Sequence, residues 1–389
     1  MRVLHLLDSL NRGGAETLAL DVCRHARANG LDLTFAATGG GDLEADFRRS
    51  GAHFVRLARR APLDLKLVGQ LRRLVAEREV EVVHCHQAVE ALHAYLATLG
   101  GGGSSSSSEG GTRRVKRVLS FHLCAADAKN RLALKFLTPR MDANVAVSRE
   151  LLACLGAEGG FATAKNFHVV YNGVDAARLR PATAGGGNDL RAELNLPEGD
   201  LLLGMVGNFY ADARKDQLTV CRALPAVFRQ APNAHFAFAG GHAAGGDGAT
   251  RIYQECVNYC REQGIAERVH FLGARADVAG VLGALDIFVF SSRKDSFGVA
   301  VVEAMLAGVP CVVSDIGALL EVTNGGEHAA VFRTGDAGDL ARRLVELVED
   351  PARRARLADG AGRWAAREFR IETHVANLLK LYKSAAGVP

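Results

Sequence analysis

Short runs of apolar and β-branched residues alternate along the whole chain with segments in which apolar residues recur at helical spacing. The short runs predict buried strands, and spacings such as that of Leu67, Leu71 and Leu74 predict amphipathic helices. In the first half the predicted strands cover residues 2–7, 31–38, 53–57, 80–84, 115–121, 143–147 and 167–171. In the second half they cover residues 201–206, 235–239, 269–272, 287–290, 309–313 and 329–332. This regular alternation predicts an α/β fold built from βαβ units with parallel sheets.

Two segments of low complexity interrupt the alternation. Residues 100–112 read GGGGSSSSSEGGT and contain no apolar residue, so we expect a mobile surface loop there. Residues 181–188 read PATAGGGN, and the alternation starts again after them. A length of 389 residues fits two domains, which we place at 1–180 and 189–370. We expect a ligand site in a cleft between them, because α/β proteins bind ligands at domain junctions and at the carboxyl ends of strands.

Composition removes several classes of protein. Apolar residues make up 48% of the chain and the formal net charge is +4, which excludes general disorder and gives no reason to expect a nucleic-acid partner. The first eight residues are too short an apolar segment for a signal peptide, and no apolar run reaches the roughly 18 residues of a membrane span. We expect the eight cysteines, Cys124 and Cys154 included, to be separate thiols in a reducing cytoplasm. Cys256 and Cys260 are expected to pack in a core.

The segment FSSRKDSFGVAVVE, residues 290–303, carries the clearest candidate chemistry. A buried strand ends at Phe290 and Gly298 opens an apolar helix, whose free backbone N–H groups could bind a phosphate. Asp295 precedes this helix and Glu303 lies within it. Carboxylates would repel a phosphate, so sugar hydroxyls are their better partners. The alternative is a capped helix with a solvated Glu303.

The first strand of each half is followed by another candidate loop. Gly13-Gly14 is either a tight turn or a phosphate cradle, and the absence of G-x-G-x-x-G argues against a dinucleotide dehydrogenase. The loop GNFYADARK, residues 207–215, brings Arg214 and Lys215 to the predicted cleft, where they could neutralise a diphosphate. A solvated basic loop is an equal alternative.

Three histidines follow predicted strands. His84 and His86 have the H-x-H spacing of a metal site, and His122 follows the next strand. Alternate residues of a strand share a face, so these side chains can instead line a cleft. No H-E-x-x-H or C-x-x-C lies nearby, and we predict no metal site.

Four segments together resemble the family four glycosyltransferases, which are retaining enzymes of the GT-B fold. They are GGAE from Gly13, VYNGVD at 170–175, the basic loop ending at Lys215, and DSFGVAVVEAMLAGVP at 295–310. The resemblance covers nearly the whole chain. It implies two Rossmann-like domains whose parallel sheets face a central cleft, with a C-terminal helix at 371–389 that crosses back to the N-terminal, acceptor-binding domain.

The resemblance also implies roles for single residues. Asp295 and Glu303 match the acids of the E-x7-E motif, which contact the donor sugar and the nucleotide ribose. Lys215 matches the lysine on the diphosphate, and His122 resembles the family histidine near the donor sugar, so the implied catalytic residues are His122, Lys215 and Asp295. The implied donor site comprises Gly13, Gly14, Asn208, Arg214, Lys215, Asp295, Ser296, Phe297, Gly298, Val299 and Glu303.

Two positions depart from the family pattern. Asp295 stands in place of a glutamate and is one methylene shorter. Asn208 stands in place of an arginine, which removes a cation from the diphosphate site. We expect Arg214, from the same loop, to replace that cation.

The activity implied by the resemblance is hexosyl transfer, of the kind used in polysaccharide biosynthesis. A sugar would pass from a nucleotide-sugar donor to a glycan, lipid-linked or small-molecule acceptor. Since Lys215, Arg214 and the helix-start amides could stabilise the departing diphosphate, we expect no metal and no other cofactor. A nucleotide-sugar epimerase of the same fold and a non-catalytic sugar-nucleotide binding protein are the alternatives.

Basic residues gather beside the amphipathic helix that starts at Leu65. They are Arg48, Arg49, Arg56, Arg59, Arg60, Lys66, Arg72 and Arg73. Such a face can bind anionic lipid at the inner face of the membrane, while a solvated face over an ordinary core helix is the alternative with more weight.

Overall fold

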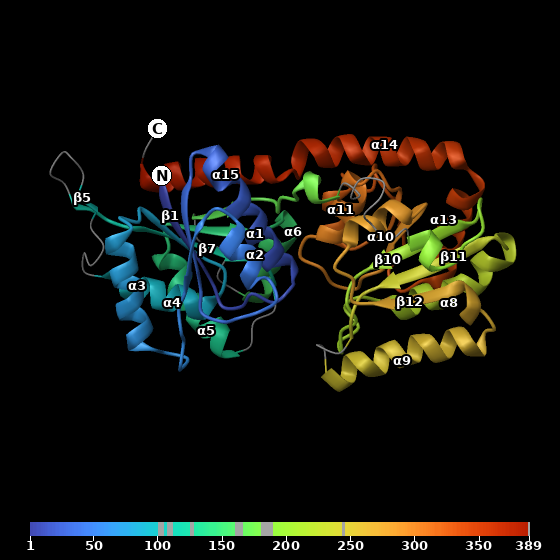
Figure 1. Ribbon diagram of the computed structural model, residues 1–389, viewed down its shortest axis with the longest axis horizontal. Helices are drawn as coiled ribbons and strands as arrows, with labels where there is room; N and C mark the ends of the chain where they lie inside the picture. The colour runs from blue at the N-terminus through green and yellow to red at the C-terminus, as the bar shows by residue number, and fades with distance from the viewer. Residues whose placement is uncertain are drawn as a thin grey trace. The chain divides into compact units, whose positions relative to one another are not determined.

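The computed structural model describes residues 1–99, 105–106, 112–124, 128–159, 166–179, 190–242 and 246–387. They form two compact units of the α/β class (Figure 1). Unit 1 comprises Met1–Val174 and Phe369–Pro389, and unit 2 comprises Asp175–Glu368. The chain therefore returns to unit 1 after completing unit 2.

The sheet of unit 1 has seven parallel strands in the order β3-β2-β1-β4-β7-β8-β9. These strands are β1 (Arg2–Leu7), β2 (Asp32–Ala37), β3 (His53–Arg56), β4 (Val82–Cys85), β7 (Lys116–Phe121), β8 (Ala143–Ala146) and β9 (Phe167–Val169). The helices are α1 (Gly14–Ala26), α2 (Glu44–Arg49), α3 (Leu65–Glu77), α4 (Ala88–Ala97), α5 (Ala128–Leu137), α6 (Arg149–Cys154) and α15 (Ile371–Ala386). Helices α3, α4 and α5 pack side by side, while α1 and α15 pack on each other (Figure 1).

The sheet of unit 2 has six parallel strands in the order β12-β11-β10-β13-β14-β15. These strands are β10 (Leu201–Val206), β11 (Ala234–Ala239), β12 (Val269–Gly273), β13 (Ile287–Phe290), β14 (Cys311–Ser314) and β15 (Ala330–Phe332). The helices are α7 (Leu190–Glu193), α8 (Gln217–Gln230), α9 (Gly246–Glu262), α10 (Val278–Ala284), α11 (Val299–Leu306), α12 (Gly317–Val322), α13 (Ala337–Glu349) and α14 (Pro351–Glu368). Strands β13 and β14 are buried along their whole length, as expected for parallel strands covered on both faces.

The hydrophobic pattern identified these strands correctly. Every predicted strand is present, and β1, β10 and β13 match the predicted ends. The predicted helix face is also confirmed, since Leu67, Leu71, Leu74 and Val75 of α3 are buried. The predicted mobile loop at 100–112 lies mostly outside the described residues. In the part that is described, Ser105–Ser106 (β5) pairs with Thr112–Arg113 (β6). The predicted linker at 181–188 lies wholly outside them.

One prediction about the cysteines is wrong. Cys124 and Cys154 were expected as separate thiols, but their sulfur atoms form a disulfide. Cys124 follows β7 and Cys154 ends α6, and the fold brings their Cα atoms to 6.0 Å although they lie 30 positions apart in the sequence. Spacing alone could not reveal this pair. The core positions predicted for Cys256 and Cys260 are confirmed, since both are fully buried free thiols.

Helix α15 completes the core of unit 1. Its Val375, Leu378 and Tyr382 belong to the same buried cluster as Leu18 and Val22 of α1. The approach of α15 explains a glycine in the VYNGVD segment, because a Cβ atom on Gly173 would lie 2.6 Å from the Cβ of His374. Within the described residues, no helix combines the length and the apolar character needed to cross a membrane.

Candidate functional site

Most of the predicted site residues lie where the strand order of each sheet reverses, and His122 follows β7, the next strand beyond β4. In unit 1 the chain leaves β1 toward β2 and β3, then returns to the other side of β1 at β4; in unit 2 the same reversal separates β10 from β13. Ligands of open α/β sheets bind beyond the carboxyl ends of the strands at such a switch point. Gly13, Gly14 and His122 belong to unit 1, and all other predicted site residues belong to unit 2.

In unit 2, the loops after β10 and β13 bring Lys215 and Asp295 into contact. The Lys215 ammonium donates to Oδ2 of Asp295 and lies 4.1 Å from the centre of the Phe290 ring. Both charged side chains are largely buried, with 14% and 17% of their surface exposed. Lys215 also forms an isolated β-bridge with Ser292, which joins the two loops. A cation is therefore held in a fixed position at the switch point.

The free helix-start amides expected for phosphate binding are not free. Oδ1 of Asp295 accepts hydrogen bonds from the backbone N–H groups of Ser296, Phe297 and Gly298 at 2.8, 3.2 and 3.2 Å. Burial raises the pKa of the Asp295 carboxyl, but the Lys215 charge and these hydrogen bonds outweigh it, so its pKa lies below the ordinary value. A donor phosphate would have to displace this carboxylate from the amides or bind beside it.

Gly298 is required by both conformation and space. Its φ of 90° lies in the left-handed region, and a Cβ atom would come within 2.6 Å of Cδ2 of Leu319. Val299 starts α11 directly after it. The sharp turn at Gly298 sets the direction of the amides that hold Asp295.

Glu303 is buried in α11 and pairs with a residue that the sequence did not reveal. The guanidinium of Arg178, in the 3₁₀ helix Ala176–Leu179, donates to Oε1 of Glu303 at 2.5 Å. The solvated Glu303 considered as the alternative is thus wrong, since only 9% of the residue is exposed. Arg178 lies just after the VYNGVD segment, which is the only signal that could have marked it.

The loop after β10 holds Asn208 and Arg214 in separate local contacts. Oδ1 of Asn208 accepts from the Gly241 N–H at 2.9 Å, which joins this loop to the one after β11. The Arg214 guanidinium bonds both carboxylate oxygens of Asp212 and lies 5.0 Å from the Tyr210 ring. Hydrogen bonding and the charge of Asp212 raise the pKa of Arg214. Arg214 therefore stays a cation, with Asp212 as its partner.

In unit 1, the turn after β1 carries the glycine pair. Gly13 caps α1 with an extended backbone, and its carbonyl accepts from the Thr17 N–H at 3.0 Å. Glu16 of the same turn accepts from the Ser9 hydroxyl at 3.1 Å, and burial raises the pKa of its carboxyl. The glycine pair therefore forms the turn that starts α1, and a phosphate cradle at this turn stays a prediction.

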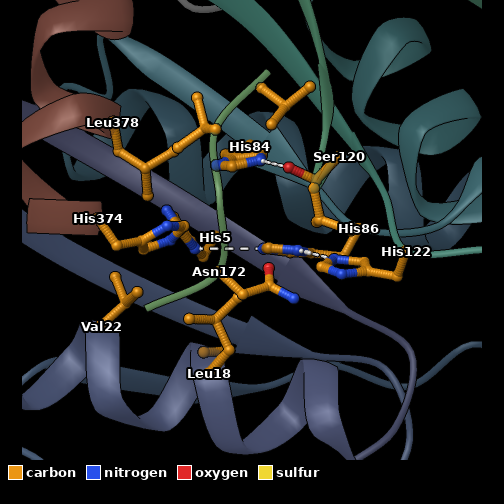
Figure 2. Close-up of a pocket in the computed structure, with 14 residues that line it drawn as sticks. His5, Leu18, Val22, His84, His86, Ser120, His122, Asn172, His374 and Leu378 are labelled. Atoms are coloured by element: carbon orange, nitrogen blue, oxygen red, sulfur yellow. Dashed lines mark hydrogen bonds between the residues drawn. The ribbon is translucent and has the colours of Figure 1, made fainter. Parts of the chain in front are cut away.

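A hydrogen-bonded group of histidines fills the neighbouring position of unit 1 (Figure 2). His5 on β1 lies opposite His84 on β4 in the strand register. His86 follows β4, and His122 follows β7. Five successive hydrogen bonds join these side chains. They link Ser120 to His84 (2.7 Å), His84 to Tyr382 (2.6 Å), Tyr382 to His5 (3.0 Å), His5 to His86 (3.3 Å) and His86 to His122 (3.0 Å). His84 and His86 both line a small cavity, which agrees with the alternative that they line a cleft.

The histidines of this group are held neutral. Burial, followed by the mutual repulsion of neighbouring imidazoles, lowers the pKa of His5 to about 3 and the pKa of His84 and His86 well below the ordinary value. The pKa values of His122 and His374 are lowered to about 4, chiefly by burial. Neutral imidazoles each carry one donor and one acceptor nitrogen.

The cavity that these side chains line has room for roughly one water molecule. Asn172 points into it, and its buried Oδ1 has no hydrogen-bond partner within the described part of the chain (Figure 2). His374 of α15 also faces the cavity and bonds the Tyr171 carbonyl at 2.6 Å. Sequence reasoning missed His5, His374 and Tyr382; only the neighbouring positions of β1 and β4 could have placed His5 beside His84.

The ring nitrogens of His5, His84 and His86 also lie within 4.8 Å of one another, a spacing that could admit a metal ion. This set differs from the one weighed in the sequence, which held His122 in place of His5. The absence of a metal requirement stays a prediction.

Two protein-family models match the chain, one over most of unit 1 and one within unit 2. Residues 12–178 match the model described as Glycosyltransferase Family 4, and residues 200–350 match the model described as Glycosyl transferases group 1. Together they cover every predicted site residue, whereas His5, His374 and Tyr382 of the unit 1 site lie outside both matches.

Relatives and solved structures agree with these matches. The chain is 24% identical over 331 residues to N-acetyl-alpha-D-glucosaminyl L-malate synthase of Bacillus anthracis, covering 82% of this chain and 79% of that protein. It is 31% identical over 252 residues to D-inositol 3-phosphate glycosyltransferase of Thermomonospora curvata, covering 63% and 57%. Its fold is similar to that of Anabaena HepE, solved in complex with UDP and glucose, with a TM-score of 0.79, 20% identity, and 97% and 98% of the two chains covered.

Proposed function

Because this chain belongs to the group 1 and family 4 glycosyltransferases and has their GT-B fold, we propose that it transfers a hexose from a nucleotide-sugar donor with retention of the anomeric configuration. The acceptor in this proposal is a glycan, a lipid-linked sugar or a small molecule. The predicted donor-site residues and the catalytic roles of His122, Lys215 and Asp295 are part of the proposal.

The observation that carries the donor proposal is the contact of Lys215 with Asp295 at the switch point of unit 2. Cleavage of a sugar–nucleotide bond leaves negative charge on a diphosphate, which a cation fixed in advance can stabilise. Lys215 is held on the Phe290 ring face, where desolvation strengthens its interaction with an anion. The neighbouring Asp295 carboxylate can accept hydrogen bonds from sugar hydroxyls.

UDP-glucose is the first donor to test, since the HepE structure contains UDP and glucose. UDP-, GDP- and ADP-sugars can be compared by thermal shift. A ligand at a hundred times its Kd stabilises the folded protein by about 2.7 kcal/mol, which makes a specific donor stand out.

The test of the donor site is the variant Lys215→Met, with Lys294→Met as the matched control. Lys294 is an exposed lysine one residue before Asp295. Removing a charged hydrogen-bonding group weakens binding roughly ten- to a hundredfold, so calorimetry of the best donor should show that loss for Lys215→Met alone. Equal affinities of the two variants would overturn the placement of the diphosphate.

Two features of the reaction need separate experiments. Retention predicts that the product keeps the α or β configuration of the donor sugar, which NMR of the anomeric proton measures directly. Metal independence predicts an unchanged rate after extensive dialysis against EDTA. A rate that falls and returns with added Mg²⁺ would contradict it.

Membrane contact is a second proposal, limited to unit 1. Leu63 and Leu65 are 53% and 74% exposed at the start of α3, beside Lys66. Exposed leucines next to cations suit an anionic bilayer surface. Vesicles with and without phosphatidylserine, sedimented at low and high salt, test it; equal recovery in all four conditions rejects it.

The cytoplasmic location is likewise proposed, and the Cys124–Cys154 disulfide weighs against it, because structural disulfides are rare in reducing compartments. Thiol labelling of denatured protein, prepared under alkylating conditions from its native cells, separates the two cases. The cytoplasmic proposal expects all eight cysteines to react, whereas six would indicate an oxidising compartment.

A further inference from the structure

We propose that the buried chain Ser120–His84–Tyr382–His5–His86–His122 fixes the tautomer of His122, so that its Nδ1 carries the proton and offers it as a hydrogen-bond donor. His84, Tyr382, His5 and His86 are then positioning residues that act through His122. The inference deepens the proposed function, on which it depends only for what His122 meets in the substrate.

The hydrogen-bond chain is continuous because each residue between Ser120 and His122 is bonded to the residue before it and to the residue after it. Each of His84, His5 and His86 uses one ring nitrogen toward each neighbour, and the Tyr382 oxygen lies between Nδ1 of His84 and Nε2 of His5. A neutral imidazole donates through one nitrogen and accepts through the other. The direction of any one bond therefore determines the direction of all five.

Ser120 determines that direction. It is 5% exposed, and within the described residues its hydroxyl has His84 Nε2 as its partner. If the hydroxyl only accepted, its own hydrogen would be buried without a partner, which costs the full desolvation of that group. Ser120 therefore donates to His84.

The remaining protons follow in order. His84 donates from Nδ1 to the Tyr382 oxygen, Tyr382 donates to Nε2 of His5, and His5 donates from Nδ1 to Nε2 of His86. His86 then donates from Nδ1 to Nε2 of His122, whose own proton must lie on Nδ1.

This tautomer limits what His122 can do. Its Nε2 lone pair is occupied by His86, so it cannot act as a general base through that nitrogen. The Nδ1–H of His122 instead suits an acceptor oxygen, such as a sugar hydroxyl or a phosphate oxygen. A neutral donor of this kind would orient the sugar without adding charge.

A metal ion on His5, His84 and His86 is the competing use of the same nitrogens. Metal binding needs lone pairs, and both nitrogens of His84 are already bonded at 2.7 and 2.6 Å. A metal would have to break the chain at Ser120 or at Tyr382. The hydrogen-bonded arrangement therefore has the stronger support.

The test is ¹⁵N NMR of histidine-labelled free enzyme near pH 7.5, which distinguishes protonated from unprotonated ring nitrogens and needs no activity. The wild type should show His122 with a protonated Nδ1 and an unprotonated Nε2. Ser120→Ala and Tyr382→Phe remove the cause of the direction, so the Nδ1-protonated share should fall from nearly all to about half. Ser120→Thr keeps the hydroxyl and should restore the wild-type spectrum.

His93→Gln is the control, because His93 is buried in the same unit but bonds the Asp64 N–H and the Val89 carbonyl, outside the chain. Its His122 signals should match the wild type. If Tyr382→Phe does not fold, Ser120→Ala, at the end of the hydrogen-bond chain, supplies the comparison. The wild-type spectrum by itself shows which nitrogen of His122 carries the proton. A wild-type His122 protonated on Nε2, an unchanged tautomer in both variants, or one equivalent of zinc bound by this cluster would each overturn the proposal.

Discussion

The two units place polar side chains at the same topological position of their sheets, but the side chains are neutral in unit 1 and charged in unit 2. Unit 1 fills its switch point with neutral imidazoles and hydroxyls joined in a chain. Unit 2 fills its switch point with ions, in the pairs Lys215–Asp295 and Arg178–Glu303. Burying a neutral polar group needs a hydrogen bond, whereas burying an ion also needs a counter-charge.

This difference indicates a division of chemistry between the units. Fixed ions in unit 2 suit a ligand with charges of its own, such as a nucleotide diphosphate. Neutral donors and acceptors in unit 1 suit hydroxyl groups. The comparison also predicts that the two units differ in what disturbs them.

Acid should produce the largest difference in stability between the two units. The pKa values of five histidines in unit 1 lie below 6.5, so the unfolded chain binds protons first as the pH falls. Stability is therefore complete above about pH 6.5 and is lost on the way down toward pH 4, by about 1.4 kcal/mol per pH unit for each histidine. Between pH 7 and 5.5 unit 1 should lose on the order of 5 kcal/mol.

Unit 2 should lose much less in that interval. The pKa of Asp295 is lowered, so its contribution to stability is present above the ordinary carboxyl pKa and is lost only at lower pH. Among the described residues of unit 2, His270 is the one histidine with a lowered pKa. The single tryptophan, Trp364, lies in α14 and reports on unit 2. Hydrogen exchange of unit 1 peptides should rise at a higher pH than the change in Trp364 fluorescence. Simultaneous transitions would contradict the comparison.

The sequence predicted the ionic site of unit 2 better than the neutral site of unit 1. The strands and the ion-bearing loops were predictable, because buried strands leave a period in the sequence and Lys215, Asp295 and Glu303 stand in short recognisable segments. The histidine chain was only partly predictable. His84, His86 and His122 lie at or after strand ends, but His5 is one polar residue within an apolar run, and Tyr382 lies 298 positions after its partner His84.

The same reasoning explains the errors. Pairing of Cys124 with Cys154 and of Arg178 with Glu303 depends on how distant segments pack, which no local spacing records. The helix-start amides were expected to be free because the sequence does not show that Asp295 turns back to accept from them.

Glycine substitutions should give the next largest difference between the units. Gly298→Ala places a side chain at a φ of 90° and against Leu319, which should cost about 2–3 kcal/mol from the backbone and the repacking together. Gly13→Ala is the matched variant in unit 1. Its backbone is extended and its Cβ would meet only the flexible end of Glu16, so we expect less than about 0.5 kcal/mol. Urea unfolding of both variants measures this, and equal losses would show that the turn at Gly298 is not strained.

Removing one ion of unit 2 should have an intermediate effect. Arg178→Met takes the guanidinium from the buried Glu303 and should destabilise unit 2 by about 1.5–2 kcal/mol, the lower part of the range for hydrogen bonds to charged groups, because the Arg178 side chain is partly exposed. In a double-mutant cycle with Glu303→Gln, the second substitution should cost less once Arg178 is gone. Additive losses would show that the pair is not coupled.

Arg214 should give the smallest effect on stability and the sharpest test of the departure at Asn208. Its contact with Asp212 is exposed on both sides, so Arg214→Ala should change the free energy of unfolding by less than about 0.5 kcal/mol. If Arg214 supplies the cation that Asn208 lacks, the same variant should raise the donor KM several-fold in a donor-hydrolysis assay. Asp212→Asn, which releases Arg214 from its partner, should lower that KM, whereas Arg261→Ala on α9 should leave it unchanged. A wild-type KM for Arg214→Ala would show that Lys215 is sufficient as the cation of this site, and that the ions of unit 2 do not need a replacement for the missing arginine.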